Sequence, residues 1–424
     1  MTDIHRRLPF FAGATEEGDG AGRMSVFASL RIRNYRLYMT GQSISVGGNW
    51  MQTIAVGWLT LQLTHSGTML GVVTCARYLP LLLLGAWGGL VVDRHDSRRL
   101  LTLTQVCAAV EATALAALSW AHMITLGLLI VLMLALGVIS VFENPSRQSL
   151  IGELVDRKHL SNAIAISSTL INIAMLMGPA LAGIIIARLG VTPCFVLDAL
   201  SYLAVIGSLL ALRSAEMIPA EQEIQAKGQI RAGLLYIWRT PALLQPMIMV
   251  YVAGILTWEF PVTLPLLTSQ TFHAGPDAYG TSMAIMSAGA ILGGFVAMGR
   301  RTVTVRTLSL SAVGWGTVIC AAALAPSLPL TLAVLVLVGF GSITFNSSAR
   351  TVLQVESAPH MRGRVMAIWS IGWMGSSVIG APIVGTIGAV GGPRVALLTG
   401  GLGAVAVGAV VLGLSTLGRR TPVR

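Results

Sequence analysis

Charged side chains that could form exchangeable ion pairs gather in one short hydrophilic stretch between two long apolar segments. The stretch begins at Gly89 and continues as Leu-Val-Val-Asp93-Arg94-His-Asp-Ser-Arg98-Arg99. Charge-assisted hydrogen bonds between a carboxylate and guanidinium groups are about twice as strong as neutral ones. Because the stretch lies between two apolar segments of helical length, we expect these pairs to form and break where the ends of membrane helices meet.

Four ionisable side chains also interrupt apolar segments, where a charge costs about 2.5–3.5 kcal/mol on insertion scales and usually faces a partner or a cavity. They are Arg77, Glu111, Asp198 and Glu259. A carboxyl group withdrawn from water favours its proton-bound form. Glu259, which stands beside Trp258, is therefore a candidate for binding protons or a cationic ligand. The alternative is a structural pair with Arg77 or with a hydroxyl group.

Uncharged polar and aromatic residues add weaker candidates. Asn49 and Gln52 have the i, i+3 spacing that places two side chains on one helix face, which suggests a polar stripe, although such stripes also hold membrane helices together. Trp58 and Trp258 could stack an aromatic ligand or serve only in packing. Arg77 could balance a carboxylate or contact an anionic ligand.

These side chains belong to a chain that is 54% apolar and 11% charged, with a mean hydropathy of +0.76. Crossing a hydrocarbon core takes about 20 apolar residues per helix, and only helices or closed barrels satisfy the backbone in lipid. The apolar segments have helical length, so the sequence predicts an all-α membrane protein. We expect twelve spans, at 38–63, 67–91, 100–121, 124–143, 163–187, 194–212, 243–268, 279–299, 306–325, 328–347, 365–389 and 395–417.

Other chemistries lack their sequence signatures. The four cysteines lie in apolar segments without a Cys-x-x-Cys pair, and no histidine pair has metal-ligand spacing. We therefore expect no metal, no cofactor and no disulfide framework. The chain also contains no Gly-x-x-x-x-Gly-Lys-Ser/Thr phosphate loop, so ATP is not the expected energy source. No catalytic arrangement points to an enzyme.

The placement of positive charge predicts the orientation of the chain in the membrane. Of 28 Lys and Arg residues, 25 fall in the N-terminal tail, the even-numbered loops and the C-terminal tail. By the positive-inside rule, both termini are cytoplasmic. The net charge of +11 is thus expected to face a lipid bilayer and not nucleic acid. Residues 1–24 have no apolar core with a cleavage site, so we expect a disordered tail and not a signal peptide.

The chain contains an internal repeat with an offset of 202 residues. It aligns Asn144 with Asn346, Gly178 with Gly380, and Gly183 with Gly385. Six helices in each half give two bundles in the same orientation, which is a known transporter plan. Basic-aromatic stretches at 30–38 and 230–239 precede the two halves and suit interfacial helices. The predicted units are a tail (1–24), an N-terminal bundle (25–212), a linker with an amphipathic helix (213–242), a C-terminal bundle (243–417) and a tail (418–424).

With these features, residues 25–417 resemble the major facilitator superfamily, and more narrowly its drug and siderophore exporters. Three stretches carry the resemblance. The Gly89 to Arg99 loop is similar to the superfamily's loop between helices two and three, with Asp96 in place of a glycine that would tolerate a left-handed turn better. Gly178, Pro179 and Gly183 resemble the exporters' helix-five motif, although Ala174 replaces its upstream glycine. The third stretch is Arg362-Gly363-Arg364 at the start of helix eleven.

The resemblance implies roles for these residues. Asp93 would pair with basic residues and with the start of helix eleven, locking the two halves in the outward-facing state. The helix-five glycines and Pro179 would bend that helix and seal one face, or would only allow close packing. In the family plan, helices one, four, seven and ten surround the central cavity. This places Glu259 at the cavity, and gives Glu111 and Asp198 structural roles in peripheral helices.

The expected function is secondary active transport by alternating access. The branch resemblance implies export of a small amphipathic molecule, such as a drug, siderophore or secondary metabolite, in exchange for protons across the cytoplasmic membrane. The expected partners are this small molecule, protons and the lipid bilayer, and the expected state is a monomer. Two alternatives remain open, an importer or facilitator of the same fold and a non-transporting scaffold or receptor.

Overall fold

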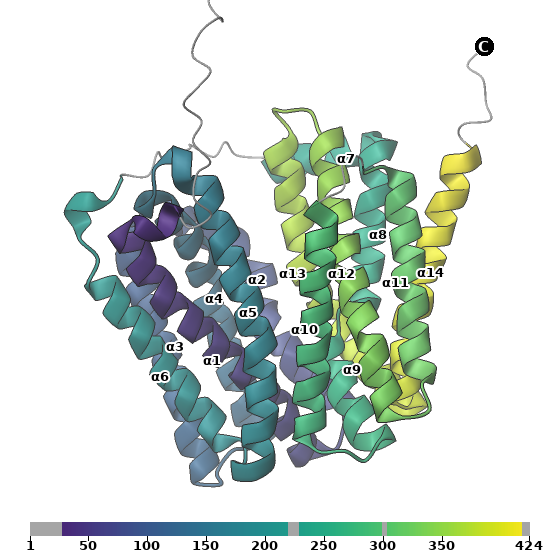
Figure 1. Ribbon diagram of the computed structural model, residues 1–424, viewed down its shortest axis with the longest axis horizontal. Coiled ribbons are helices and arrows are strands. Elements are labelled where there is room, and N and C mark those ends of the chain that lie inside the picture. Colours follow the sequence, from purple (N-terminus) through teal and green to yellow (C-terminus); the bar gives the residue numbers. More distant parts are fainter. Residues whose placement is uncertain (1–27, 219–228, 299–302, 418–424) are drawn as a thin grey trace, which may run out of the picture.

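The computed structural model describes residues 28–218, 229–298 and 303–417, and every regular element among them is helical (Figure 1). The first half contains η1 (Ala28–Arg31), α1 (Arg33–Thr64), α2 (Gly67–Val92), α3 (Ser97–Trp120), α4 (Leu126–Leu154), α5 (Arg157–Leu189) and α6 (Thr192–Leu210). The short turn η2 (Ser214–Glu216) and the helix α7 (Gln229–Arg239) follow. The second half contains α8 (Pro241–Thr257), α9 (Phe260–Leu266), the π-helical η3 (Leu267–Thr271), α10 (Pro276–Met298), α11 (Val305–Leu324), α12 (Leu328–Glu356), α13 (Arg362–Gly391) and α14 (Pro393–Leu417).

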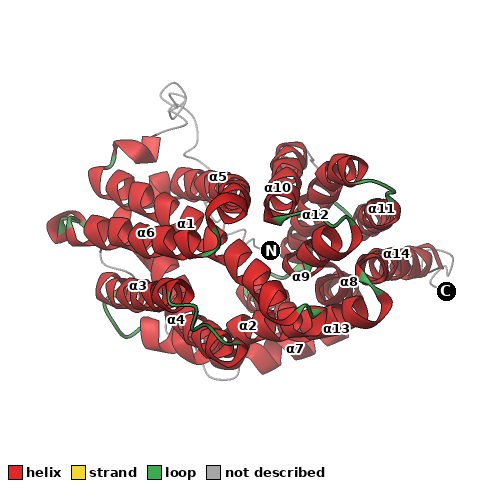
Figure 2. Cartoon of the chain, turned by 90° about the horizontal axis from the view of Figure 1, so that it is seen from below, coloured by secondary structure: helices red, strands yellow, loops and turns green. Residues whose placement is uncertain are grey.

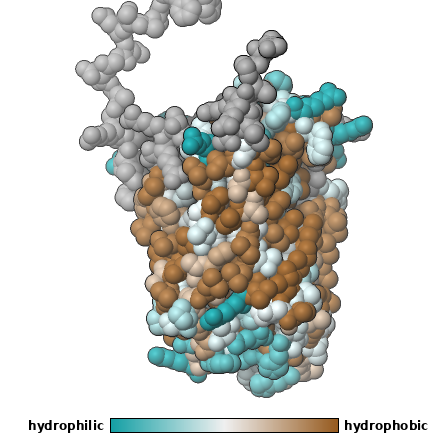
Figure 3. Space-filling view, turned by 90° about the vertical axis from the view of Figure 1, so that its right-hand side faces the viewer, coloured by the Kyte–Doolittle hydropathy of each residue, from teal (hydrophilic) through white to brown (hydrophobic). Residues whose placement is uncertain are grey.

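Eleven segments among the described residues are long and apolar enough to cross a membrane, with α8, α9 and η3 counted as one. The remaining long helix is α1, which has 32 residues. Its polar side chains, including the buried Gln42 and Gln52, lower its hydropathy. Eleven spans and α1 are consistent with the predicted twelve. Apolar side chains cover the flank between two hydrophilic ends, as a lipid-embedded surface requires (Figure 3).

The helices form two lobes, α1–α6 and α8–α14 (Figures 1 and 2). We define the terminal face as the end that carries the connections after α2, α4, α6 and α12, and the opposite face as the other end. Across the lobes, α2 packs against α13 and α5 against α10. These two pairs are equivalent under the internal repeat, since each joins the fifth helix of one lobe to the second helix of the other.

Glycines bring the two lobes together near the opposite face. A methyl group added at Gly67 in α2 would lie 2.7 Å from the carbonyl oxygen of Gly385 in α13. One added at Gly183 in α5 would lie 2.9 Å from the carbonyl oxygen of Pro276 and 3.0 Å from Gly280 in α10. Among the described residues, no side-chain hydrogen bond or ion pair joins the lobes. The contact therefore depends on small residues that let helix backbones approach closely.

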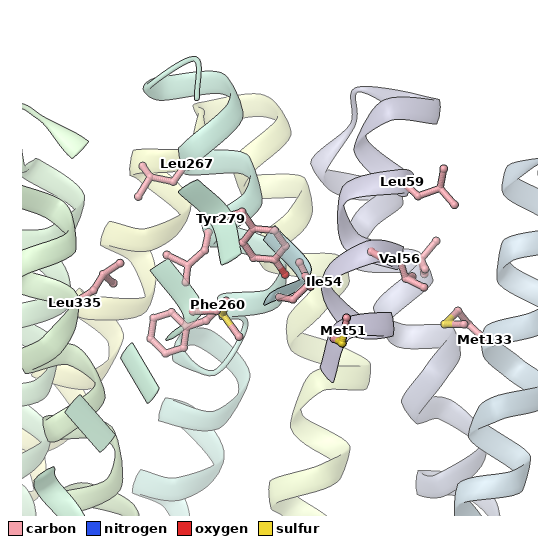
Figure 4. Close-up of a cluster of buried hydrophobic side chains, with 14 of the residues drawn as sticks. Met51, Ile54, Val56, Leu59, Met133, Phe260, Leu267, Tyr279 and Leu335 are labelled. Atoms are coloured by element: carbon pink, nitrogen blue, oxygen red, sulfur yellow. The ribbon is translucent and has the colours of Figure 1, made fainter. Parts of the chain in front are cut away.

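Apolar side chains fill the space beside these glycine contacts. Ile54 of α1 and Tyr279 of α10 lie next to one another across the lobes, with Phe260 of α9 nearby (Figure 4). All three are at most 2% exposed. The lobes thus share one core near the opposite face.

The seventh membrane segment is broken, where the sequence had predicted one continuous span at 243–268. Helix α8 ends at Thr257 and α9 begins at Phe260, and between them Glu259 has φ −81° and ψ 38°, outside the helical region. Pro261 explains the break, because it has no N–H to donate to the carbonyl group of Thr257. Trp258 and Glu259 consequently occupy a helix interruption inside the membrane region.

The two basic-aromatic stretches behave differently. The prediction of an interfacial helix at 30–38 is wrong, because residues from Arg33 onward belong to α1, and Tyr35 and Tyr38 are fully buried. They pack in a core under α5 and α6, where the hydroxyl group of Tyr35 donates to the carbonyl oxygen of Ala163 (2.6 Å). The second stretch forms the separate helix α7, which packs on α13 and leaves Trp238 75% exposed.

Candidate functional site

A cavity of about 290 Å³ lies beside α1 and is lined almost wholly by the first lobe. Pro261, next to the helix break, is the second lobe's contribution. The wall combines hydrogen-bonding and charged groups with apolar side chains, so it can accept an amphipathic molecule. The lining residues are Gln42, Ser45, Val46, Asn49, Trp50, Thr53, Val56, Gly57, Leu70, Val73, Thr74, Arg77, Tyr78, Leu81, Met133, Ser140, Glu143, Asn144, Arg147, Ile171, Met175, Tyr202 and Pro261.

Arg77 presents its guanidinium group to this cavity from the middle of α2. The group donates to Asn49 Oδ1 (2.9 Å) and to Thr53 Oγ1 (3.2 Å), one helical turn apart on α1. Asn49 in turn donates through Nδ2 to the hydroxyl group of Tyr202 on α6 (3.3 Å). Three helices therefore fix the position of Arg77, and all of its hydrogen-bond partners named here are neutral.

A second charged group lines the cavity from α4. Arg147 lies 4.0 Å from the Glu143 carboxylate one turn earlier and donates to Asn144 Oδ1 (2.9 Å). In the sequence, Asn144 stood out only as a mark of the repeat, and neither Glu143 nor Arg147 was predicted to line a site. The available signal was the i, i+4 spacing of Glu143 and Arg147 at the end of an apolar span.

Two buried carboxyl groups, one on α3 and one on α6, pack against α1 outside the cavity lining. Gln52 donates to Glu111 Oε2 (2.9 Å), so Gln52 points toward α3 while Asn49 faces the cavity, and the predicted polar stripe divides between two directions. Asp198 on α6 accepts from Ser201 (3.5 Å) and packs against the backbone of Gly48. Glu111 and Asp198 are 4% and 0% exposed. They interact electrostatically with each other and with Arg77, but neither forms a hydrogen bond to it among the described contacts.

Glu259 lies at the break between α8 and α9 and is 1% exposed. It does not belong to the cavity lining. Its carboxylate lies near Ser377 and beside Gly380 on α13, and Cys75 on α2 is also nearby. Among the described residues, Glu259 Oε1 has no hydrogen-bond partner. Glu259 thus sits where α2 and α13 bring the two lobes together, and it forms no ion pair with Arg77 among the described contacts.

The predicted aromatic residues lie outside the cavity lining. Trp258 packs in a cluster with Trp373 (ring centroids 4.0 Å apart) and Trp315 (5.4 Å). Trp58 is half-buried against the core. The tryptophan that does line the cavity is Trp50.

The loop after α2 is open in this structure. Asp93 caps the C-terminal end of α2 with its backbone N–H, and its side chain is exposed, as are those of Arg94 and Arg99. Arg98 is engaged within the first lobe, where it donates to the carbonyl oxygens of Leu209 (2.8 Å) and Leu210 at the end of α6. Among the described contacts, none joins Asp93 to the start of α13.

Asp96 has a local role that the sequence did not reveal. The backbone at this position is extended and not left-handed, with φ −63° and ψ 114°. Its carboxylate accepts from the backbone N–H of Arg99 (2.9 Å) and so caps the N-terminal end of α3. Aspartate is a favoured residue for this position.

The helix-five residues lie at close contacts. Gly178 packs against Trp50 and Gly47 on α1, within the first lobe. Gly183 and the carbonyl group of Pro179 pack against Gly280 on α10, across the lobes. Helix α5 continues through Pro179 without interruption. This segment therefore contributes directly to the closed contact near the opposite face.

The sequence is similar to those of known membrane transport proteins. A family model described as a transmembrane secretion effector matches residues 24–418. The chain is 27% identical over 249 residues to the staphyloferrin A transporter of Staphylococcus aureus, a match that covers 58% of this chain and 62% of the relative. It is 26% identical over 353 residues to the multidrug efflux pump Tap of Mycolicibacterium fortuitum, covering 80% and 84%.

A solved structure shares the fold. It is the inward-facing, occupied form of a bacterial homologue of the human lysosomal transporter Spinster, with a TM-score of 0.70 at 14% identity, covering 92% of this chain and 97% of that one. Among the residues that the structure describes, no group of His, Cys, Asp or Glu side chains could hold a metal ion. The chain belongs to the transmembrane secretion effector family of major facilitator transporters, and its relatives include a staphyloferrin A transporter and a multidrug efflux pump.

Proposed function

We propose that this transporter exports a small amphipathic molecule in exchange for protons, across a bacterial cytoplasmic membrane and with both termini in the cytoplasm. Exporter names among its relatives support the direction, since one is a multidrug efflux pump and another a macrolide efflux protein. The mixed polar and apolar cavity supports an amphipathic cargo. The protein acts as a monomer, because each chain contains both lobes that alternating access requires.

The arrangement of the lobes supports an inward-facing state. The glycine contacts of Gly67 with Gly385 and of Gly183 with Gly280 close the opposite face. At the terminal face, the exposed Asp93 has no described partner on α13. Cargo enters the cavity from the cytoplasm in this state. When the lobes rock, Asp93 moves against the start of α13 and the glycine contacts separate.

Glu259 supplies the proton coupling in this proposal, and its burial at the contact between lobes is the observation that carries it. A charged carboxylate sealed between α2 and α13, with no described hydrogen-bond partner for Oε1, would be costly to bury without an ion partner. The opposite face therefore closes readily only after Glu259 takes up a proton from outside. Cargo entry from the cytoplasm then accompanies release of that proton inside.

Two measurements test the function. Spent medium from cells making the wild-type protein is compared by untargeted mass spectrometry with medium from otherwise identical cells that do not make it. We expect a compound enriched outside the wild-type cells, and depletion from the medium would instead indicate import. That compound is then followed in everted vesicles energised by a pH gradient.

In those vesicles we expect transport by the wild-type protein and by Glu216→Gln, which changes an exposed carboxylate in the linker. We expect none by Glu259→Gln, whose neutral side chain cannot carry a proton. Undiminished pH-driven transport by Glu259→Gln would refute the proposed coupling while leaving the export direction intact.

A further inference from the structure

Arg77 is the feature of the cavity that the proposed function leaves unexplained. A guanidinium group stays charged at any physiological pH, and a charge at this depth is costly unless it is paired. Yet the hydrogen-bond partners that hold it, Asn49 and Thr53, are neutral. Among the described residues, no carboxylate forms an ion pair with it. The site therefore contains a fixed positive charge with no direct ion-pair partner among the described residues.

The nearest buried carboxyl groups do not take this place. The Glu111 carboxylate accepts from Gln52 and that of Asp198 from Ser201, and both lie behind α1, outside the cavity lining. Their electrostatic attraction reaches Arg77 without contact. Asn49 and Thr53 use two acceptors on α1 to aim the guanidinium group, which leaves its other N–H donors available on the cavity side.

The other charged residues of the cavity wall leave its net charge positive. Its described charged residues are Arg77, Arg147 and Glu143, so the lining carries a net charge of about +1 with all three ionised. Glu143 and Arg147 already face each other at 4.0 Å. Apolar side chains such as Val73, Leu81 and Met133 line the same space. The free charge is therefore positive and lies beside an apolar surface.

We propose that the cargo is an amphipathic anion whose carboxylate, or a similar acidic group, pairs with Arg77 while its apolar body packs against Val73, Leu81 and Met133. This inference rests on the proposed function and names the chemical class of its cargo. A planar guanidinium group binds a carboxylate through two parallel hydrogen bonds. Arg77 acts here as a specificity-determining residue of the binding site.

The test is a binding comparison of two matched probes, 2-naphthylacetate and its neutral amide, 2-naphthylacetamide. Each is equilibrated by dialysis with the full-length protein in nanodiscs of zwitterionic lipid, and binding to empty nanodiscs is subtracted. We expect the wild-type protein to bind the acid at least about tenfold more tightly than the amide, as a charge-assisted pair implies. No pH gradient is applied, so the result is independent of proton coupling and of transport direction.

Three variants sharpen the comparison. Arg77→Gln keeps a polar side chain of similar length and should reduce the acid-to-amide ratio to about one, whereas Arg77→Lys should keep part of the preference. Glu143→Gln removes the competing negative charge from the lining and should raise the ratio. An acid preference that survives in Arg77→Gln, or no preference in the wild-type protein, would overturn the proposal.

The competing explanation is that Arg77 serves only as a distant counter-ion for Glu111 and Asp198. In that case Arg77→Gln would lower the melting temperature, the double variant Arg77→Gln/Glu111→Gln would restore it, and the probes would bind the wild-type protein equally. Loss of the acid preference in a variant that melts like the wild-type protein supports the anion site. Failure of this test with intact pH-driven efflux would remove the cargo class and leave the proposed function standing.

Discussion

The two lobes share one helical plan but place their polar groups differently. The first lobe surrounds its cavity with Arg77, Glu143 and Arg147 and keeps two further carboxyl groups behind α1. At the repeat offset of 202 residues, the position of Glu143 corresponds to Phe345 in the second lobe, which is fully buried and stacks on Trp315 at 5.4 Å. The interior of the second lobe is therefore aromatic where that of the first is charged.

The first helices of the lobes differ in the same way. Helix α1 is continuous over 32 residues and holds its polar groups through side-chain hydrogen bonds. Its counterpart is split into α8 and α9 at Glu259, whose carboxylate lies beside α13 of its own lobe and near Cys75 of the other. Under the proposed function, the first lobe recognises cargo and the second links protonation to the contact between lobes.

The largest effect is expected from making the seventh membrane segment one continuous helix, as α1 is, because this would remove the difference between the two lobes. Pro261→Ala returns the N–H that the Thr257 carbonyl group lacks, so α8 and α9 can join and carry Glu259 away from its place between α2 and α13. We expect pH-driven efflux to be lost, as in Glu259→Gln, while the preference for 2-naphthylacetate over its amide, which Arg77 sets, is retained. Pro246→Ala in α8, a proline that does not interrupt its helix, is the control. Normal efflux by Pro261→Ala would show that the break is not needed for coupling.

The glycine contacts offer the next largest effect. Gly280→Val would push a branched side chain into Gly183 and the carbonyl group of Pro179, so the opposite face could not close as it does here. We expect the protein to shift toward the outward-facing state and transport at least about tenfold more slowly, because small free-energy differences set such populations. Labelling of a cysteine placed in the cavity lining, from outside the cell, measures the shift.

Gly314→Val on α11 is the matched control for that experiment. It makes the same chemical change in a membrane helix, but a side chain at Gly314 meets no neighbouring atom within 4 Å. Equal labelling of the Gly280→Val and wild-type proteins would show that the opposite face closes without this contact.

The sequence predicted the fold well because membrane crossing depends on length and hydropathy, which are local properties. The repeat marked by Gly183 and Gly385 also predicted two lobes, and both glycines do lie at the contact between them. The site was less predictable. Which face of α1 meets the cavity depends on packing between helices, so neither the turn of Gln52 toward Glu111 nor the use of Arg98 to bind the end of α6 could be foreseen.

Proline and capping signals were present but were read incompletely. Pro261 indicated a possible interruption of the seventh span, yet the prediction kept one helix, because prolines also occur inside continuous helices such as α5 at Pro179. Asp96 was compared only with the glycine that the family has at this position. Its side chain instead accepts from the backbone N–H of Arg99, three residues later, which is a common way to cap the start of a helix. Glu259 could be identified as a candidate because carboxylates are rare in apolar segments, but its location between the lobes could not be predicted.

A smaller effect is expected behind α1, where the comparison predicts structural groups. Gln52→Leu removes the donor to the buried Glu111 carboxylate. Leaving such a group unsatisfied costs about 1–3 kcal/mol, so we expect a lower melting temperature in detergent with the acid preference for 2-naphthylacetate unchanged. Thr113→Val, on the exposed side of α3, should melt like the wild-type protein. An unchanged melting temperature together with lost pH-driven efflux would move the coupling role from Glu259 to Glu111.

The smallest effect is expected at Asp93. An anion near a helix N-terminus contributes about 0.3–1 kcal/mol at an exposed site, and in this structure the carboxylate has no described partner to lose. Asp93→Asn should therefore destabilise only the outward-facing state and change the ratio of the two states by less than about tenfold. Its effect on cysteine labelling should be opposite in sign to that of Gly280→Val. Asp156→Asn, at an exposed position in the next loop of the same face, is the control. If Asp156→Asn changed cysteine labelling as much as Asp93→Asn does, general surface charge, and not a specific pair with α13, would set the balance between the two states.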